Sequence, residues 1–231
     1  EKLSGMNEYG IAAYKTVNDF AQREVDFILQ IGGIETRTNQ KLGQEVELDE
    51  LRKEYDAVFL SVGLWDVNAL GLESEELEGV FNAVDTISEL RQSANLMELP
   101  VGRRIVVIGG GNTAIDIAVQ SKKLGAEDVT IAYRRGPEQM SATWKEQEFA
   151  QTNGVHVKHW VAPKSLQSEN GHVTGIEFEC MEMNSEGKLT ATGELRFIEA
   201  DVVFKAIGQS FEDTDFSGSE MPEIVGGKIA V

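Results

Sequence analysis

The most informative feature of this 231-residue chain is a run of three glycines that joins a strand-like segment directly to a helix-like one. A buried-strand pattern ends at Ile108, the glycines occupy residues 109–111, and apolar residues then recur at helical spacing from Ala114. In a dinucleotide-binding turn, Gly109 would make the tight turn, Gly111 would let the backbone approach a pyrophosphate, and Ala114 would allow close packing of helix against strand. We therefore predict a dinucleotide site here, with the first N–H groups of the helix facing the phosphates.

The polar residues at the start of the predicted helix allow two interpretations. Asn112 and Thr113 either cap the helix or contact the dinucleotide, and the sequence favours neither. Asp116 lies one turn further, where we expect a favourable interaction with the helix N-terminus rather than a direct contact with the nicotinamide. The predicted dinucleotide contacts at this turn are Gly109, Gly110, Gly111, Asn112, Thr113 and Ala114.

Two arginines at the end of the next strand indicate which dinucleotide binds. Residues 127–135 are predicted to form the second strand of the same unit, and they end about 20 residues past the glycines, where the adenosine ribose is recognised. An acidic residue there would favour NAD, whereas the planar, permanently charged groups of Arg134 and Arg135 suit a 2′-phosphate. We therefore expect NADPH, with NADH as the alternative cofactor. The other interpretation is that both arginines belong to a solvated loop.

The composition excludes several classes of function. With 21 basic and 39 acidic residues, the chain carries a net charge of −18, which disfavours general nucleic-acid binding and attraction to anionic membranes. No apolar run has the length of a transmembrane helix, and no signal-peptide pattern is present. The lone Cys180 excludes a disulfide framework, a zinc cluster and a CxxC redox pair. We expect a protein of the reducing cytoplasm, with no nucleic-acid or membrane partner.

The N-terminal part of the chain is predicted to alternate helices and strands. A helix starts at Thr16 with a capping-box-like pattern and stops at residues 32–33. A short strand near residues 34–38 and a helical turn or two at residues 51–55 follow. Residues 56–63 have the pattern of a buried strand whose final glycine would let the backbone approach a ligand.

The second half of the chain departs from plain strand–helix alternation. A helix over residues 84–96 precedes a domain boundary that we place near Pro100, and another helix runs through residues 144–149. The segments that follow, beginning with a strand over residues 155–161, have the pattern of a β-meander with a hairpin signal at residues 170–171. Its last strand, residues 201–208, is a second buried strand that ends in glycine. Two such strands suggest two nucleotide-binding units.

A series of motifs in a specific order and spacing runs along most of the chain. They lie at residues 109–116, 133–135, 140–142 with Glu146, 200–203 and 206–208. In these motifs the chain resembles the NAD(P)H- and FAD-binding subunits of the glutamate synthase (small chain) and dihydropyrimidine dehydrogenase type. Residues 4–15 resemble the segment that follows the second FAD strand in this family, and they lean toward the dihydropyrimidine dehydrogenase branch. Ser141, where many relatives have proline, is a departure that affects a loop more than the chemistry.

The resemblance implies an α/β fold in which a Rossmann-like NAD(P)H-binding domain with a β-meander is inserted into a FAD-binding domain. We accordingly predict that residues 1–99 and 211–231 form a partial FAD-binding domain and residues 100–210 the NAD(P)H-binding domain. The family's glycine-rich turn for FAD and its later Gly-Asp motif are both missing from this sequence. The chain also starts at Glu1, without an initiator methionine, and ends within a strand-like pattern, so we expect a fragment of a longer protein.

The resemblance also implies the cofactors, their contacts and a partner. NADPH would be bound by the glycine turn, the two arginines and two further residues, Ile207 and Gly208. FAD, in the full-length protein, would contact a partial site made of Gly5, Tyr9, Gly10, Val62 and Gly63. The nicotinamide would give a hydride to FAD, and electrons would leave singly for an iron–sulfur or flavin-containing catalytic subunit or domain. The isolated fragment would then be inactive.

This chemistry needs no protein nucleophile and no metal ion, and the sequence offers neither a Ser/His/Asp arrangement nor a metal-ligand spacing. Structural or surface roles are expected for the three histidines, His156, His159 and His172. Packing or surface roles are likewise expected for Met140, Trp65, Trp144 and Trp160. Two other functions stay open: a module that senses NAD(P)H without turning it over, and a methyltransferase that uses S-adenosylmethionine. The arginines disfavour the methyltransferase, because such a site usually has a carboxylate for the ribose hydroxyls.

Overall fold

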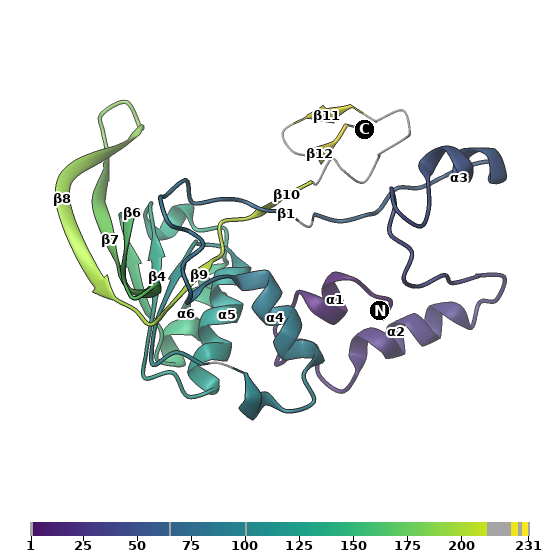
Figure 1. Ribbon diagram of the computed structural model, residues 1–231, viewed down its shortest axis with the longest axis horizontal. Coiled ribbons are helices and arrows are strands. Elements are labelled where there is room, and N and C mark those ends of the chain that lie inside the picture. Colours follow the sequence, from purple (N-terminus) through teal and green to yellow (C-terminus); the bar gives the residue numbers. More distant parts are fainter. Residues whose placement is uncertain (1, 65, 100, 212–222, 226–227, 231) are drawn as a thin grey trace. The chain divides into compact units, whose positions relative to one another are not determined.

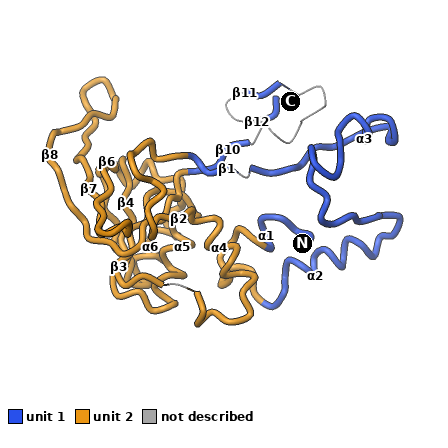
Figure 2. Tube along the Cα trace, viewed as in Figure 1, with its two compact units in different colours: residues 1–8, 18–68, 208–231 blue, residues 9–17, 69–207 orange. Residues whose placement is uncertain are grey.

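The computed structural model describes residues 2–64, 66–99, 101–211, 223–225 and 228–230, and the chain forms two compact units (Figure 2). Unit 1 comprises residues 1–8, 18–68 and 208–231, and unit 2 comprises residues 9–17 and 69–207. The chain therefore enters unit 2 twice. Its second entry, at Ala69, comes well before Pro100, the expected boundary, which lies outside the described residues. The assignment of one domain to each cofactor stays a prediction.

A parallel five-stranded sheet forms the centre of unit 2. Its strands follow the order β2-β9-β3-β4-β5. Their bounds are β2 (Val80–Asn82), β9 (Val202–Lys205), β3 (Arg104–Ile108), β4 (Asp128–Tyr133) and β5 (His156–His159). The two strands predicted on either side of the glycine turn and its helix are confirmed as β3 and β4. The α/β class and the Rossmann-like arrangement are confirmed as well.

Successive side chains of β3 point to opposite faces of the sheet, and each face is buried in its own core. Val106 and Ile108 pack against a second sheet. Ile105 and Val107 pack among the helices, which are α4 (Ala83–Gln92), α5 (Asn112–Lys123) and α6 (Trp144–Thr152). Unit 2 is therefore built in three layers, with helices on one face of the parallel sheet and the second sheet on the other (Figure 1).

The second sheet is an antiparallel meander of β6 (Val161–Glu169), β7 (His172–Met183) and β8 (Leu189–Glu199). The predicted hairpin is confirmed, because Asn170 and Gly171 connect β6 to β7 with positive φ angles of 52° and 84°. The expectation that β5 and β9 belong to this meander was wrong, because both strands pair within the parallel sheet. Strand β9 is buried on both faces, and such continuous burial is typical of a parallel strand.

Unit 1 consists of short elements joined by irregular segments. Its helices are α2 (Phe20–Leu29) and α3 (Leu48–Glu54), and α1 (Met6–Tyr9) ends at the first residue of unit 2. Strand β1 (Asp66–Val67) pairs with β10 (Gln209–Ser210), and β11 (Ile224–Val225) pairs with β12 (Lys228–Ile229). Two 3₁₀ helices, Leu96–Glu98 and Pro137–Gln139, belong to unit 2. Within the described residues, no helix combines the length and the apolar character that a membrane span requires.

Two strands predicted in unit 1 do not form. Residues 34–38 and 56–63 have no strand structure, and Phe59 is 91% exposed. A buried strand needs a hydrogen-bonded neighbour and a covering layer, and no described strand pairs with either segment. The helix predicted from Thr16 starts instead at Phe20, after a left-handed Asp19, and no side chain caps it.

Candidate dinucleotide-binding site

The glycine turn lies between the end of β3 and the start of α5. Gly109 has a φ of 147°, and a Cβ atom there would lie 2.2 Å from the carbonyl oxygen of Ala206. A Cβ atom at Gly110 would lie 2.5 Å from two ring carbons of Tyr133. The packing of the chain itself therefore requires the first two glycines.

Gly111 differs from its two neighbours, because the packing of the chain does not require glycine at this position. Its φ of −99° and ψ of 178° are extended angles that any residue adopts. The atom nearest to a new Cβ would be the hydroxyl oxygen of Ser141 at 3.2 Å, and that exposed side chain can rotate away. A side chain at Gly111 would thus meet only the movable hydroxyl of Ser141, beside the N-terminus of α5.

Four successive backbone N–H groups at this N-terminus have no hydrogen-bond acceptor among the described residues. They belong to residues 110–113, whereas the next two residues already donate to the carbonyl of Gly111. Gly111 is the N-cap of the 12-residue helix α5, and no side chain caps the helix. Asn112 and Thr113 therefore do not act as caps, which removes one of the two interpretations of these residues. Free N–H groups and the helix dipole together make an anion-binding site.

Arg134 and Arg135 follow β4 at the same edge of the sheet. Strands β3 and β4 run parallel with Ile108 opposite Ala132, so the arginines leave β4 close to the level at which the glycine turn leaves β3. Both arginines are exposed, and neither guanidinium makes a hydrogen bond or an ion pair with any residue that the structure describes. Two free cations and four free N–H groups thus gather at one edge of the sheet.

The segment of residues 134–143, which we call the wall loop, runs beside the glycine turn. The N–H of Ala142 donates to the carbonyl of Gly110 at 3.0 Å. The ring of Tyr133 covers Gly110, and its hydroxyl donates to the carbonyl of Gln139 at 2.6 Å. These bonds join the glycine turn and the wall loop into one cradle.

Asp116 has partners that the sequence did not reveal. It is 4% exposed and accepts hydrogen bonds from the N–H of Ala12 at 3.2 Å and from the hydroxyl of Tyr14 at 3.1 Å. The ammonium of Lys15 lies 2.6 Å from its Oδ1 atom. The expected interaction with the helix N-terminus was wrong, because Asp116 lies beyond the first turn of α5 and faces these three residues instead. Burial, reinforced by the charge of Asp116, raises the pKa of Tyr14.

The remaining residues predicted for NADPH and FAD are divided between the two units. Ile207 belongs to unit 2, where it packs against the core below the meander, and Gly208 belongs to unit 1. Of the residues predicted for FAD, unit 2 contains Tyr9 and Gly10. Unit 1 contains Gly5, Val62 and Gly63. These assignments stay predictions.

The histidines and the cysteine lie apart from the glycine turn in sequence. His156 and His172 are exposed, and burial lowers the pKa of the half-buried His159. Cys180 is a free, buried thiol. Among the described residues, no group of histidine, cysteine and acidic side chains is arranged to hold a metal ion.

The methionine and tryptophans singled out by the sequence have packing or surface positions where the structure describes them. Met140 is buried in the core beneath the helices. Trp144 is 67% exposed, and Trp160 is half-buried against Gly136 of the wall loop. Trp65 lies outside the described residues.

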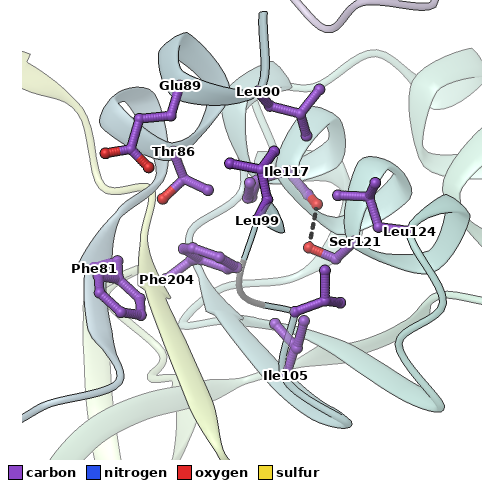
Figure 3. A pocket seen from close by; sticks show the side chains of 11 residues that line it. Phe81, Thr86, Glu89, Leu90, Leu99, Ile105, Ile117, Ser121, Leu124 and Phe204 are labelled. Atoms are coloured by element: carbon purple, nitrogen blue, oxygen red, sulfur yellow. Dashed lines mark hydrogen bonds between the residues drawn. The ribbon is translucent and has the colours of Figure 1, made fainter. Parts of the chain in front are cut away.

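A small apolar cavity of about 50 Å³ lies between α4, α5 and the parallel sheet (Figure 3). Phe81, Ile117 and Phe204 line it, and the hydroxyl of Ser121 donates to the carbonyl of Ile117 at 2.7 Å. A cavity of this size holds at most a few water molecules. It is a packing cavity rather than a second substrate site.

The chain matches known proteins over most of its length. It is 33% identical over 222 residues to the small chain of NADPH glutamate synthase from Escherichia coli (strain K12), which covers 90% of this chain and 47% of that protein. It is 34% identical over 223 residues to the beta subunit of NADPH-Fe(3+) oxidoreductase from Geobacter sulfurreducens, which covers 92% of this chain and 32% of that protein. The predicted likeness to the glutamate synthase small chain is confirmed, and the chain spans less than half the length of these curated relatives.

Solved structures show the same fold. FprA, an oxidoreductase from Mycobacterium tuberculosis, in complex with NADPH, matches with a TM-score of 0.73 and 21% identity over 97% of this chain and 66% of that chain. The thioredoxin reductase of T. acidophilum matches with a TM-score of 0.62 and 16% identity over 97% of this chain and 71% of that chain. The family of pyridine nucleotide-disulphide oxidoreductases matches residues 3–231, and the chain therefore belongs to that family.

Proposed function

We propose that this chain is the NADPH-binding part of an electron-input oxidoreductase subunit. The observation that carries the proposal is the contrast among the three glycines. The packing of the chain requires Gly109 and Gly110, whereas a side chain at Gly111 would meet only the movable hydroxyl of Ser141, beside N–H groups of residues 110–113 that have no acceptor among the described residues. A dinucleotide pyrophosphate accounts both for a third glycine that packing does not require and for the free donors.

The arginines support NADPH over NADH. Arg134 and Arg135 are exposed and have no partner among the described residues, although acidic residues outnumber basic ones by 39 to 21 in this chain. A 2′-phosphate would supply the missing anion through charge-assisted, bidentate hydrogen bonds. NADH, which lacks that phosphate, would bind through the glycine turn alone and therefore more weakly.

FAD is assigned to the full-length protein rather than to this chain alone. When bound, FAD accepts a hydride from the nicotinamide and releases electrons one at a time. The described residues contain one glycine turn at the N-terminus of a long helix, and the proposed pyrophosphate of NADPH occupies it. The part of the chain that the structure describes therefore offers no second turn of this kind for the pyrophosphate of FAD. Gly5, Tyr9, Gly10, Val62 and Gly63 stay proposals for part of a FAD site.

The electron acceptor is proposed to be an iron–sulfur or flavin-containing catalytic subunit or domain. The relatives support this choice, because they are named as the small chain and the beta subunit of larger NADPH-linked enzymes. The cytoplasmic location is proposed on the same basis. It agrees with the free thiol of Cys180.

Titration calorimetry with NADPH and NADH, together with an absorbance spectrum of the purified chain, tests the proposal. We expect NADPH to bind more tightly than NADH, and no flavin to stay bound through purification. A chain that responds to neither nicotinamide cofactor contradicts the proposed function. A yellow protein with stoichiometric flavin contradicts the assignment of FAD to the full-length protein.

A further inference from the structure

The ammonium of Lys15 bridges two carboxylates that belong to different helices. Its Nζ atom lies 2.6 Å from Asp116 Oδ1 of α5 and 3.0 Å from Glu146 Oε2 of α6. Asp116 is buried, with a side-chain exposure of 5%, whereas the side chains of Lys15 and Glu146 are partly exposed, at 24% and 27%. One positive charge thus faces two negative charges in a partly buried site.

Both carboxylates lie near the helix ends that border the cradle. Asp116 is the fifth residue of α5, which starts directly after the glycine turn, and Glu146 is the third residue of α6, which starts directly after the wall loop. Thr143 caps α6 by accepting a hydrogen bond from the N–H of Glu146 at 3.4 Å. The bridge made by Lys15 therefore connects α5 and α6, the helices that follow the glycine turn and the wall loop.

The electrostatics make Lys15 essential to this arrangement. Burial opposes its charge, but the carboxylates of Asp116 and Glu146 outweigh that effect and raise the pKa of Lys15 above its ordinary value. The amine stays charged at neutral pH. Without it, two carboxylates would face each other in a partly buried site, where like charges repel more strongly than in bulk water. The neighbouring ring of Tyr14 packs against Phe149 of α6, with centroids 5.3 Å apart, and does not neutralise them.

We propose that Lys15 is a positioning residue for dinucleotide binding, which sets the separation of the glycine turn from the wall loop by holding α5 and α6 together. The inference rests on the proposed function, since it concerns the same cradle. Lys15 acts through Asp116 and Glu146 and need not touch the dinucleotide. The sequence pattern did not reveal this role, because Lys15 is far from both carboxylates along the chain.

The test compares NADPH dissociation constants of four proteins by titration calorimetry below their melting temperatures. Lys15→Met removes the charge and should weaken NADPH binding about tenfold, the equivalent of one charge-assisted hydrogen bond to phosphate. Lys15→Arg keeps the charge and should bind within about threefold of the wild type, on the same scale. The matched control is Arg104→Met, which breaks the ion pair with Asp201 elsewhere in unit 2. This control should lower the melting temperature and leave NADPH binding unchanged.

A second pair of variants separates repulsion between the carboxylates from general loss of structure. Glu146→Gln in the Lys15→Met background removes one of the two repelling charges, so it should restore part of the lost NADPH binding. Glu146→Gln alone keeps the Lys15–Asp116 bridge and should weaken binding less than Lys15→Met does. If Lys15→Met does not fold, the inference is tested with the Glu146→Gln variant alone. An NADPH dissociation constant equal to that of the wild type then overturns the inference.

The outcomes distinguish the inference from the proposed function. A wild-type chain that binds no NADPH overturns both. A wild type that binds NADPH, together with a folded Lys15→Met variant that binds equally well, overturns the role of Lys15 and leaves the proposed function in place. Loss of binding in Lys15→Met without recovery in the double variant contradicts the electrostatic argument.

Discussion

Replacing Gly111 with alanine should separate nucleotide binding from folding. The backbone angles of Gly111 accommodate alanine, and the new methyl would lie 3.2 Å from the hydroxyl of Ser141, an exposed side chain that can move. Loss of glycine at a helix N-cap costs about 0.5–1 kcal/mol. Alanine also lowers the conformational entropy of the unfolded chain, and this effect offsets about 0.4–1 kcal/mol of the lost stability. We therefore expect a melting temperature within about 4 °C of the wild type.

Binding should change far more than stability. The methyl would occupy the space beside the free N–H groups of residues 110–113, where the pyrophosphate is proposed to lie. If two charge-assisted hydrogen bonds are lost, each of about 1.5–3 kcal/mol, the total loss is about 3–6 kcal/mol. That corresponds to a dissociation constant for NADPH raised at least about 100-fold.

Gly109→Ala is the matched control, because it adds the same methyl group two residues earlier. There the methyl would lie 2.2 Å from the backbone carbonyl of Ala206, at a φ of 147° that side chains rarely adopt. This variant should lose stability outright. Titration calorimetry with NADPH and thermal melts followed by circular dichroism measure both effects. A folded Gly111→Ala chain that binds NADPH within a few-fold of the wild type would refute the placement of the phosphates at this turn.

Two further predictions concern stability. Desolvation opposes the charge of the half-buried Glu75, but two backbone N–H groups and Lys205 outweigh that effect and lower its pKa from the ordinary 4.5. These charge-assisted bonds of Glu75 therefore add about 1–2 kcal/mol to the free energy of unfolding. This stabilisation is fully present above the pKa that Glu75 has in the unfolded chain, and it is lost as the pH falls through the lower pKa of the folded chain. Denaturant unfolding should show Glu75→Gln less stable than the wild type at pH 7 and the difference reduced at pH 3; an equal difference at both values contradicts the argument. In the meander, a Cβ atom at Gly175 would lie 2.3 Å from the ring of Phe197 and 2.7 Å from the carbonyl oxygen of Ile198. Gly175→Ala should lower the melting temperature by several degrees and leave NADPH binding intact, and an unchanged melting temperature would show that the meander adapts freely.

The sequence was most informative where structure depends on neighbouring residues. The strand, the glycine turn and the helix at β3 and α5 were all predicted, because their backbone requirements are local. The hairpin at Asn170 and Gly171 was predicted for the same reason. The arginines after β4 follow that strand at the edge where the glycine turn lies, and their predicted contact with a 2′-phosphate stays a prediction.

Features that depend on distant partners were missed. Nothing near Asp116 in the sequence indicates that Ala12, Tyr14 and Lys15 would surround it. Strand β9 was expected in the meander, since an apolar run shows that a strand is buried but does not say which strands lie beside it. The strand predicted at residues 56–63 was wrong, because an apolar run does not show whether a neighbouring strand exists, and no described strand pairs with this segment.

The most direct test of the central claim, that this chain binds NADPH with its 2′-phosphate at Arg134 and Arg135, is a comparison of NADPH and NADH dissociation constants. They are measured for the wild type and the Arg134→Ala/Arg135→Ala variant at two ionic strengths. Because both arginines are exposed, we expect a net loss equivalent to about one charge-assisted hydrogen bond of about 1.5–3 kcal/mol, so the variant should bind NADPH about 10 to 100-fold more weakly while NADH binding changes little. Higher salt should shrink the difference, since both arginines are exposed. Equal losses for the two cofactors, or a wild type that prefers NADH, would contradict the claim.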